Sequence, residues 1–315
     1  MASMTLWRYS PRDTILLVIS IVQLGLNVWL ATTWDERSWL DLLWLWPGGV
    51  LLFWYNAVVA THNFVHTPWF RSEVANRIYA AVDSINLGVP LTFCRFHHLN
   101  HHRHGNDRRD AAGRTQDHSS TYRFGRDGAP EGAFTYGLLG LFRSGTVEAW
   151  REAVRSGQKA RLLSETAVCG LGLVTYAALS WQYVLLFFVP VFYVGSFFGI
   201  LTNYYQHAGA LPGTRWANAV SHYGRIYNWL CCNEGYHQEH HLRPGLHWTR
   251  RAELRELLPR LERPVSSVPP PLGFLAVKGV RGRVRTVLLF AVGLATSLAV
   301  ALAGLVLIVG QAFLD

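Results

Sequence analysis

Histidine is concentrated in short stretches of this sequence of 315 residues, and its spacing there is that of one face of a helix. Residues i, i+3 and i+4 lie on one side of an α-helix, so three imidazoles can point at one spot. Such a run is costly to bury without partners, and imidazole nitrogen is a common ligand of transition metals. The four stretches are His62-x-x-x-His66, His98-x-x-His101-His102, Asn203-x-x-x-His207 and His237-x-x-His240-His241.

The number of imidazoles in these stretches indicates two metal ions. Structural zinc takes four protein ligands and catalytic zinc three, so nine histidines exceed what one ion holds. Iron, zinc, copper and nickel all suit imidazole ligands with an added amide. Few carboxylates accompany the histidines. Glu234, Asp107 and Asp110 either fix an imidazole tautomer or are plain solvated groups, and Glu239 is expected on a different side of its helix.

The remaining histidines and the nearby arginines carry weaker predictions. His97 competes with His98 for the second stretch through a shift of one residue. Histidines outside the stretches are expected to support the site or to lie at the surface: His104, His118, His222 and His247. The arginines are expected to form a solvated basic surface, with contact to a substrate headgroup or an acidic electron carrier as the alternative. They are Arg103, Arg108, Arg109, Arg243, Arg250 and Arg251.

The composition favours a membrane protein over two soluble domains, since mean hydropathy is +0.13 and only 16% of residues are charged. A membrane-spanning helix needs roughly 20 apolar residues. Residues 14–34 and 42–60 meet this length, the second with an expected kink or break near Pro47. The uncharged run 166–205 is long enough for two passes, which we expect to turn near Ser180, and 286–314 is a further candidate. Residues 78–93 are shorter, so we predict an interfacial or re-entrant segment there.

Basic residues indicate how these spans are oriented. With the spans above, 28 of the 29 Lys and Arg residues fall on one side, and only Arg37 falls on the other. The positive-inside rule makes the arginine-rich side cytoplasmic. Its two long segments, 61–165 and 206–285, and the adjoining span ends hold all the histidine stretches. We therefore expect one shared site on the cytoplasmic face.

The histidine stretches, interleaved with two pairs of spans, resemble those of the membrane fatty acid desaturase and hydroxylase superfamily over roughly residues 40–250. The resemblance implies an all-α membrane bundle of four core helices with a cytosolic helical cap holding two irons. It implies one domain over 1–285, and the extra helix in 286–315 departs from the pattern. By position it implies these iron ligands, with Asn203 acting through water: His62, His66, His98, His101, His102, His207, His237, His240 and His241.

The expected function is O₂-dependent oxidation of an unactivated C–H bond on a long-chain lipid, with fatty acyl desaturation as the leading reaction. Hydroxylation, carotenoid ketolation or hydroxylation, and oxidative decarboxylation are alternatives at the same type of site, and a metal transporter or sensor is the alternative of another class. We expect two Fe ions and O₂ as co-substrate. No fused cytochrome b5 domain is expected, so electrons are expected from a separate ferredoxin, rubredoxin or cytochrome b5-like carrier. No nucleic-acid partner is expected.

The predicted topology can be tested with reporter fusions. Fusions after Gly105 and Pro270 should report the cytoplasm, and fusions after Trp34, Ser180 and Asp315 should report the opposite side. This pattern follows from the placement of the basic residues. An outer-side signal after Gly105 would separate the first two histidine stretches and contradict a shared site.

Overall fold

The computed structural model describes residues 6–143, 145–257 and 264–276, together with a few isolated positions between 284 and 291. Within them the chain is helical, and pairing between extended segments is limited to two isolated bridges. The α-helices are α1 (Asp13–Thr32), α2 (Trp39–Tyr55), α3 (His62–His66), α4 (Glu73–Leu87), α5 (Leu91–His104), α6 (Ala133–Gly140), α7 (Thr146–Arg155), α8 (Lys159–Leu179), α9 (Trp181–Tyr183), α10 (Val189–His207), α11 (Arg225–Leu230), α12 (His237–Leu242) and α13 (Arg251–Leu257). Shorter 3₁₀ turns occupy Trp34–Glu36, Leu141–Arg143, Trp248–Arg250 and Pro270–Ala276.

Four helical stretches are long and apolar enough to cross a membrane, and they confirm the first four predicted spans. They are Asp13–Thr32, Trp39–His66, Lys159–Leu179 and Trp181–His207. The turn expected at Ser180 is confirmed, because its backbone is extended between α8 and α9. The fifth span predicted over 286–314, and with it the boundary of the segment 286–315, lies outside the described residues apart from the isolated positions.

Of the kink or break expected near Pro47, the break is wrong, because α2 continues through Pro47 to Tyr55, and the kink stays a prediction. Proline is tolerated inside membrane helices, where neighbouring groups compensate for its missing donor. The adjoining Gly49 has a packing role instead. A Cβ atom there would lie 2.7 Å from the Phe187 ring, so the absent side chain lets α2 approach the span Trp181–His207 closely.

The same span contains an irregular segment that ends directly before His62. Residues Asn56–Thr61 form a π-helical stretch between α2 and α3. The buried Asp83 of α4 accepts hydrogen bonds from Asn56 Nδ2 at 2.6 Å and from Thr61 Oγ1 at 2.5 Å. These donors belong to the first and last residues of the π-helical stretch. Asp83 therefore fixes both ends of the segment that sets the rotation of α3 relative to α2.

The segment 78–93, predicted to be interfacial or re-entrant, comprises most of α4, a tight turn and the start of α5. Gly88 ends α4 with a positive φ of 65°, a conformation that glycine adopts without steric cost. The chain then changes direction, so α5 starts beside α4 and is not its continuation. This turn directs the second histidine stretch to the same end of the bundle as the first.

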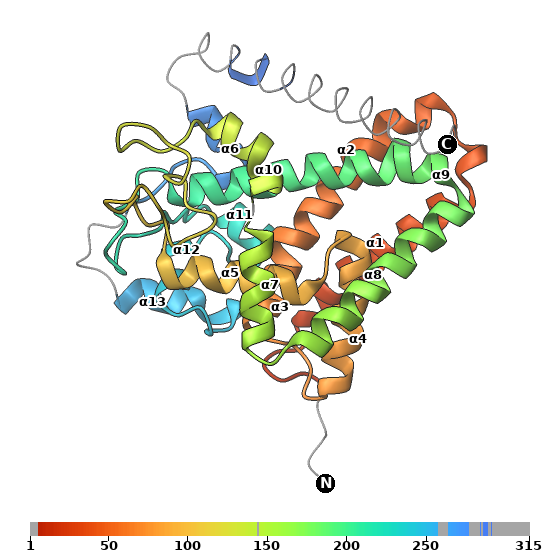
Figure 1. Cartoon of the computed structure of the whole chain (residues 1–315), viewed down its shortest axis with the longest axis horizontal. Coiled ribbons are helices and arrows are strands. Elements are labelled where there is room, and N and C mark those ends of the chain that lie inside the picture. The colour runs from red at the N-terminus through yellow and green to blue at the C-terminus, as the bar shows by residue number, and fades with distance from the viewer. Residues whose placement is uncertain are drawn as a thin grey trace.

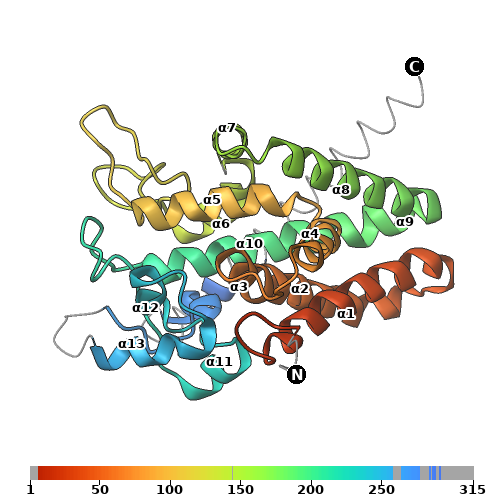
Figure 2. The same cartoon turned by 90° about the horizontal axis from the view of Figure 1, so that it is seen from below.

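The histidine-bearing ends of the spans meet a group of helices that we call the cap, consisting of α5 to α7 and α11 to α13. Figures 1 and 2 show α9 at the opposite end of the molecule from α12 and α13. The start of α1 also contacts the cap, because the Asp13 carboxylate accepts from His247 Nε2 at 3.0 Å and from Trp248 Nε1 at 2.8 Å. The N-terminal end of α1 and all the histidine stretches therefore share one side.

Asp83→Ala should lower thermal stability and loosen the first histidine stretch. Its removal leaves the buried donors of Asn56 and Thr61 unsatisfied, at about 1–3 kcal/mol for each group. Thermal unfolding in detergent, followed by fluorescence, measures the effect. Ile78→Ala, on the exposed face of the same helix, is the control and should melt close to the unmodified chain. Equal melting temperatures for the two variants would show that the hydrogen bonds of Asp83 to Asn56 and Thr61 contribute nothing to stability.

Candidate metal centre

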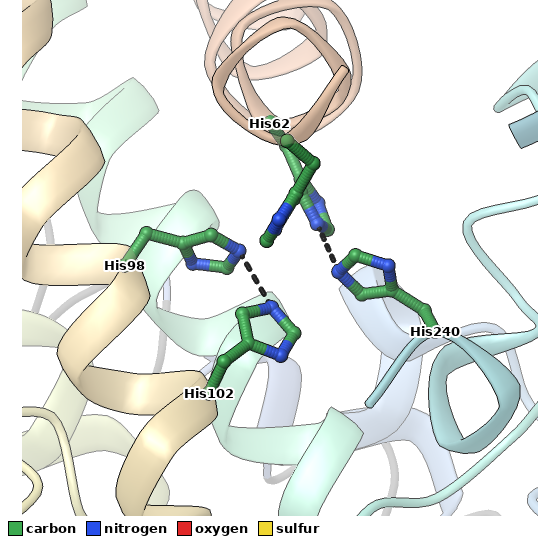
Figure 3. Close-up of side chains that lie close together, drawn as sticks. His62, His98, His102 and His240 are labelled. Atoms are coloured by element: carbon green, nitrogen blue, oxygen red, sulfur yellow. Dashed lines mark hydrogen bonds between the residues drawn. The ribbon is translucent and has the colours of Figure 1, made fainter. Parts of the chain in front are cut away.

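The first cluster of histidines gathers five side chains from three parts of the fold. The span end α3 supplies two, α5 supplies two and α12 supplies one. Their metal-ligating nitrogens all lie within 4.8 Å of one another. Figure 3 shows four of these rings converging from three helices. The members of this first cluster are His62, His66, His98, His102 and His240.

The second cluster contains four fully buried histidines. One comes from α5, one from the last turn of α10 and two from α12. One nitrogen of each lies within 4.8 Å of the others. The members of this second cluster are His101, His207, His237 and His241. All nine histidines predicted from the sequence are thus brought together, in two groups that could each hold a metal ion.

The ring nitrogens face one another in a way that suits a cation between them. Nε2 of His62 lies 2.7 Å from Nε2 of His240, and Nε2 of His98 lies 2.9 Å from that of His102. In the second cluster Nε2 of His101 lies 2.9 Å from Nε2 of His207. Each pair forms a hydrogen bond if one of its rings carries the proton on Nε2, and the two lone pairs repel if neither ring does. A shared metal ion satisfies several lone pairs at once.

Within the described part of the chain, several buried nitrogens of the two clusters also have no hydrogen-bond partner. Both ring nitrogens of His241 are unpartnered, as is Nε2 of His66. Buried polar atoms are nearly always satisfied in proteins, so these atoms require a ligand from outside the chain. The donor set is all imidazole, which fits iron, zinc, copper or nickel and does not fit calcium or magnesium. The residues present therefore fit a transition-metal pair.

Buried carboxylates orient one histidine of each cluster. Glu234 Oε2 lies 2.9 Å from Nδ1 of His62, and Asp117 Oδ2 lies 2.8 Å from Nδ1 of His101. An acceptor at Nδ1 places the ring proton there and leaves the Nε2 lone pair directed into the cluster. A backbone carbonyl does the same for His207, whose Nδ1 lies 2.7 Å from the Asn218 oxygen.

Both carboxylates are held ionised. Burial by itself raises the pKa of Asp117, but the charge and hydrogen bond of His101 and the bonds from Ser119 bring it below its usual range. Burial likewise opposes ionisation of Glu234, but the charge of Arg251 and the adjacent His62 imidazole bring its pKa below the ordinary value. Each carboxylate therefore adds a negative charge beside a cluster that could hold a metal ion.

Five histidines of the cap are held neutral at physiological pH. Burial in the cluster, followed by the charges of neighbouring groups, puts the pKa of each well below 6.5. This holds for His98, His102, His237, His240 and His241. A neutral imidazole keeps its lone pair, which is the form that binds a metal.

Arg251 was expected in a solvated basic surface, and that prediction is wrong. Its side chain is only 1% exposed and donates to Glu234 Oε1 at 2.7 Å and to Asn63 Oδ1 at 2.8 Å. Asn63 in turn donates to Glu234 through Nδ2 at 2.9 Å. Since a buried carboxylate needs a counter-charge, Arg251 and Asn63 hold Glu234 in place against His62.

Of the other predicted carboxylates, neither Asp107 nor Asp110 forms a hydrogen bond to a clustered histidine in the described part of the chain. Asp107 accepts from the backbone of residues 116 and 117, and Asp110 caps its own turn. Glu239 points away from the histidines, as predicted, and accepts from Ser221 and Tyr223.

His97 and His247 lie outside both clusters. His97 and Asn203 line the cavity described below. Asn203 Nδ2 donates to the Tyr136 hydroxyl at 2.9 Å. His247 is buried against Asp13 and ties α1 to the cap, so the predicted surface or supporting role does not describe it.

A mostly apolar cavity of about 320 Å³ adjoins the clusters. His62, His98 and His101 lie in its wall, and the rest includes apolar side chains of α2, α10 and the α4–α5 turn. Cavities of this size hold small molecules or parts of lipids. The arrangement places an apolar ligand directly against the imidazoles of both clusters.

Three polar residues of the site were not identified from the sequence. Asp117 lies in the long loop between α5 and α6, Tyr136 lies in α6, and Arg251 begins the short helix α13. No periodic spacing links them to the histidine stretches. Only the fold brings them there, so local sequence patterns could not have identified them.

The comparison with protein families agrees with this geometry. A family model described as fatty acid desaturase matches residues 7–268, which include every histidine of both clusters. A search of curated proteins found no significant match to the chain.

Asp117→Asn should weaken metal binding at the second cluster by roughly 10–100-fold, because the amide keeps only one acceptor oxygen, replaces the other by an NH₂ donor and lacks the negative charge. Competition with a chelator, followed by metal analysis, measures this change. Asp110→Asn is the matched control, since Asp110 is exposed and contacts only its own turn. Equal metal retention in the two variants would remove Asp117 from the site.

Proposed function

This chain belongs to the fatty acid desaturase family, and we propose that it is a membrane di-iron oxidoreductase that uses O₂ to oxidise an unactivated C–H bond of a long-chain lipid. The reaction we assign is desaturation of a fatty acyl group. The observation that supports it best is the pair of all-imidazole clusters beside an apolar cavity.

In this proposal the nine clustered histidines hold two iron ions, five nitrogens around one and four around the other. Asn203, one turn before His207 on α10, is proposed to act through water. The iron pair, when bound, supplies the oxidant that an unactivated C–H bond requires. Zinc has no redox chemistry and cannot take this role.

The chain's own residues bind and position the substrate. Apolar side chains such as Phe53 and Phe192 line the part of the cavity formed by the spans and suit a hydrocarbon chain. Filling this cavity excludes water from the clusters and holds a carbon beside them. Glu234 and Asp117 keep the imidazoles oriented, so the metal positions do not shift when the substrate enters.

A metal transporter is the competing function, and the position of the histidines argues against it. Transport sites lie near the middle of the membrane, at interrupted helices. Here the histidines of the spans occupy their last turns, and the others belong to the cap. A site at this junction suits an enzyme that takes its substrate from the membrane.

We further propose that the site faces the cytoplasm, on the basis of the basic residues counted above. A separate carrier then supplies electrons from that side. A ferredoxin, a rubredoxin and a cytochrome b5-like protein all meet the requirement of a small one-electron donor.

The test is expression in a host of defined lipid composition, with metal analysis and lipid mass spectrometry in the presence and absence of O₂. The unmodified chain should contain about two irons and form an unsaturated product only with O₂. His240→Ala should lose product and iron but still insert in the membrane, because it removes one ligand from the first cluster.

His104→Ala is the control and should retain iron and product, since His104 ends α5 outside both clusters. Hydroxylated lipid in place of an alkene would change the reaction but keep the centre. Active protein with stoichiometric zinc and no iron requirement would contradict the proposal.

A further inference from the structure

The short helix α11 has one buried face and one exposed apolar face. Tyr227 and Asn228 are buried against the protein. On the other face Ile226 is 76% exposed, Trp229 is 80% exposed and Leu230 is 51% exposed. These three positions follow helical spacing, so they form one continuous surface. A surface of this kind on a soluble face would leave large apolar side chains in water.

The level of α11 relative to the spans follows from a direct contact. The Tyr55 hydroxyl, at the end of α2, donates to the backbone oxygen of Leu230 at 2.7 Å. From Trp39 to Tyr55 the helix rises about 24 Å, against roughly 30 Å for the hydrocarbon core. At the far end of that span Trp39 and Leu40 are both 74% exposed, which is expected of apolar side chains that face lipid. Leu230 therefore lies near the edge of the hydrocarbon layer.

The residue types on the exposed face suit this boundary. Tryptophan is enriched at membrane interfaces, where its ring is apolar and its N–H is hydrated. Arg225, also exposed, begins the helix and can reach lipid phosphate with its long side chain. Figure 2 shows α11 at the periphery of the molecule. We propose that α11 inserts its face of Ile226, Trp229 and Leu230 into the headgroup boundary of the bilayer and anchors the cap to phospholipid.

This anchor is close in sequence to the metal centre. Two buried cysteines and Asn233 connect Leu230 to Glu234, the carboxylate beside His62. Cys232 and Asn233 both have positive φ angles, so this connection is a tight turn. The lipid contact of α11 thus fixes the level of the cap within a few residues of the first cluster.

Photo-crosslinking tests the proposal in the full chain. Trp229→p-benzoylphenylalanine, reconstituted in vesicles of phosphatidylcholine and phosphatidylglycerol, should form lipid adducts detected by mass spectrometry. Trp216→p-benzoylphenylalanine is the control, because Trp216 is 42% exposed in the loop after α10 and should give several-fold less lipid adduct. Ile226→p-benzoylphenylalanine, one turn earlier on the same face, repeats the test if the first variant does not fold.

Two results would overturn the anchor. Adducts between two copies of the chain would make α11 a protein interface. Lipid adducts no more abundant than those at Trp216 would place the α11 face in water.

Discussion

The close approach of imidazole nitrogens from different parts of the fold is the constraint on which the rest of the site depends. Nε2 atoms of His62 and His240 lie 2.7 Å apart, although they belong to a span and to the cap. One N–H between the two rings makes this contact a hydrogen bond, and a cation bound by both lone pairs would hold the same two parts together. Metal binding at the first cluster would therefore stabilise the docking of the cap on the spans, and the docking would stabilise metal binding.

The surrounding polar groups extend this coupling outward. Glu234 contacts His62 of the span end and Arg251 of α13, and Asn63 contacts both Glu234 and Arg251. Asp83 acts on the membrane side of the same histidine, through Thr61. His62 is thus fixed from the cap by one carboxylate and from the bundle by another. A position held from two directions tolerates little movement when a substrate fills the adjoining cavity.

The sequence alone predicted the four spans within the described residues and all nine clustered histidines, because both signals are local. Span length depends on apolar runs, and the i, i+3, i+4 spacing of His237, His240 and His241 needs only one turn of helix. The role of Arg251 and the continuity of α2 at Pro47 depend on partners distant in sequence. Proline signals a break only where nothing compensates for it, and Arg251 could be recognised as buried only once Glu234 was placed beside it.

Two connections join the membrane level of the fold to the first cluster, and they run side by side. One is the span itself, which continues from Tyr55 through the π-helical segment to His62. The other is the turn from Leu230 to Glu234. They are linked at the membrane end by the hydrogen bond from Tyr55 to Leu230 and at the metal end by the contact of His62 with Glu234. Because the two paths are joined at both ends, a shift of the cap relative to the bilayer would have to distort the metal centre. The same links keep the clusters and the adjoining cavity at one depth, which is the condition that the proposed oxidation of one particular carbon of a membrane-embedded chain would need.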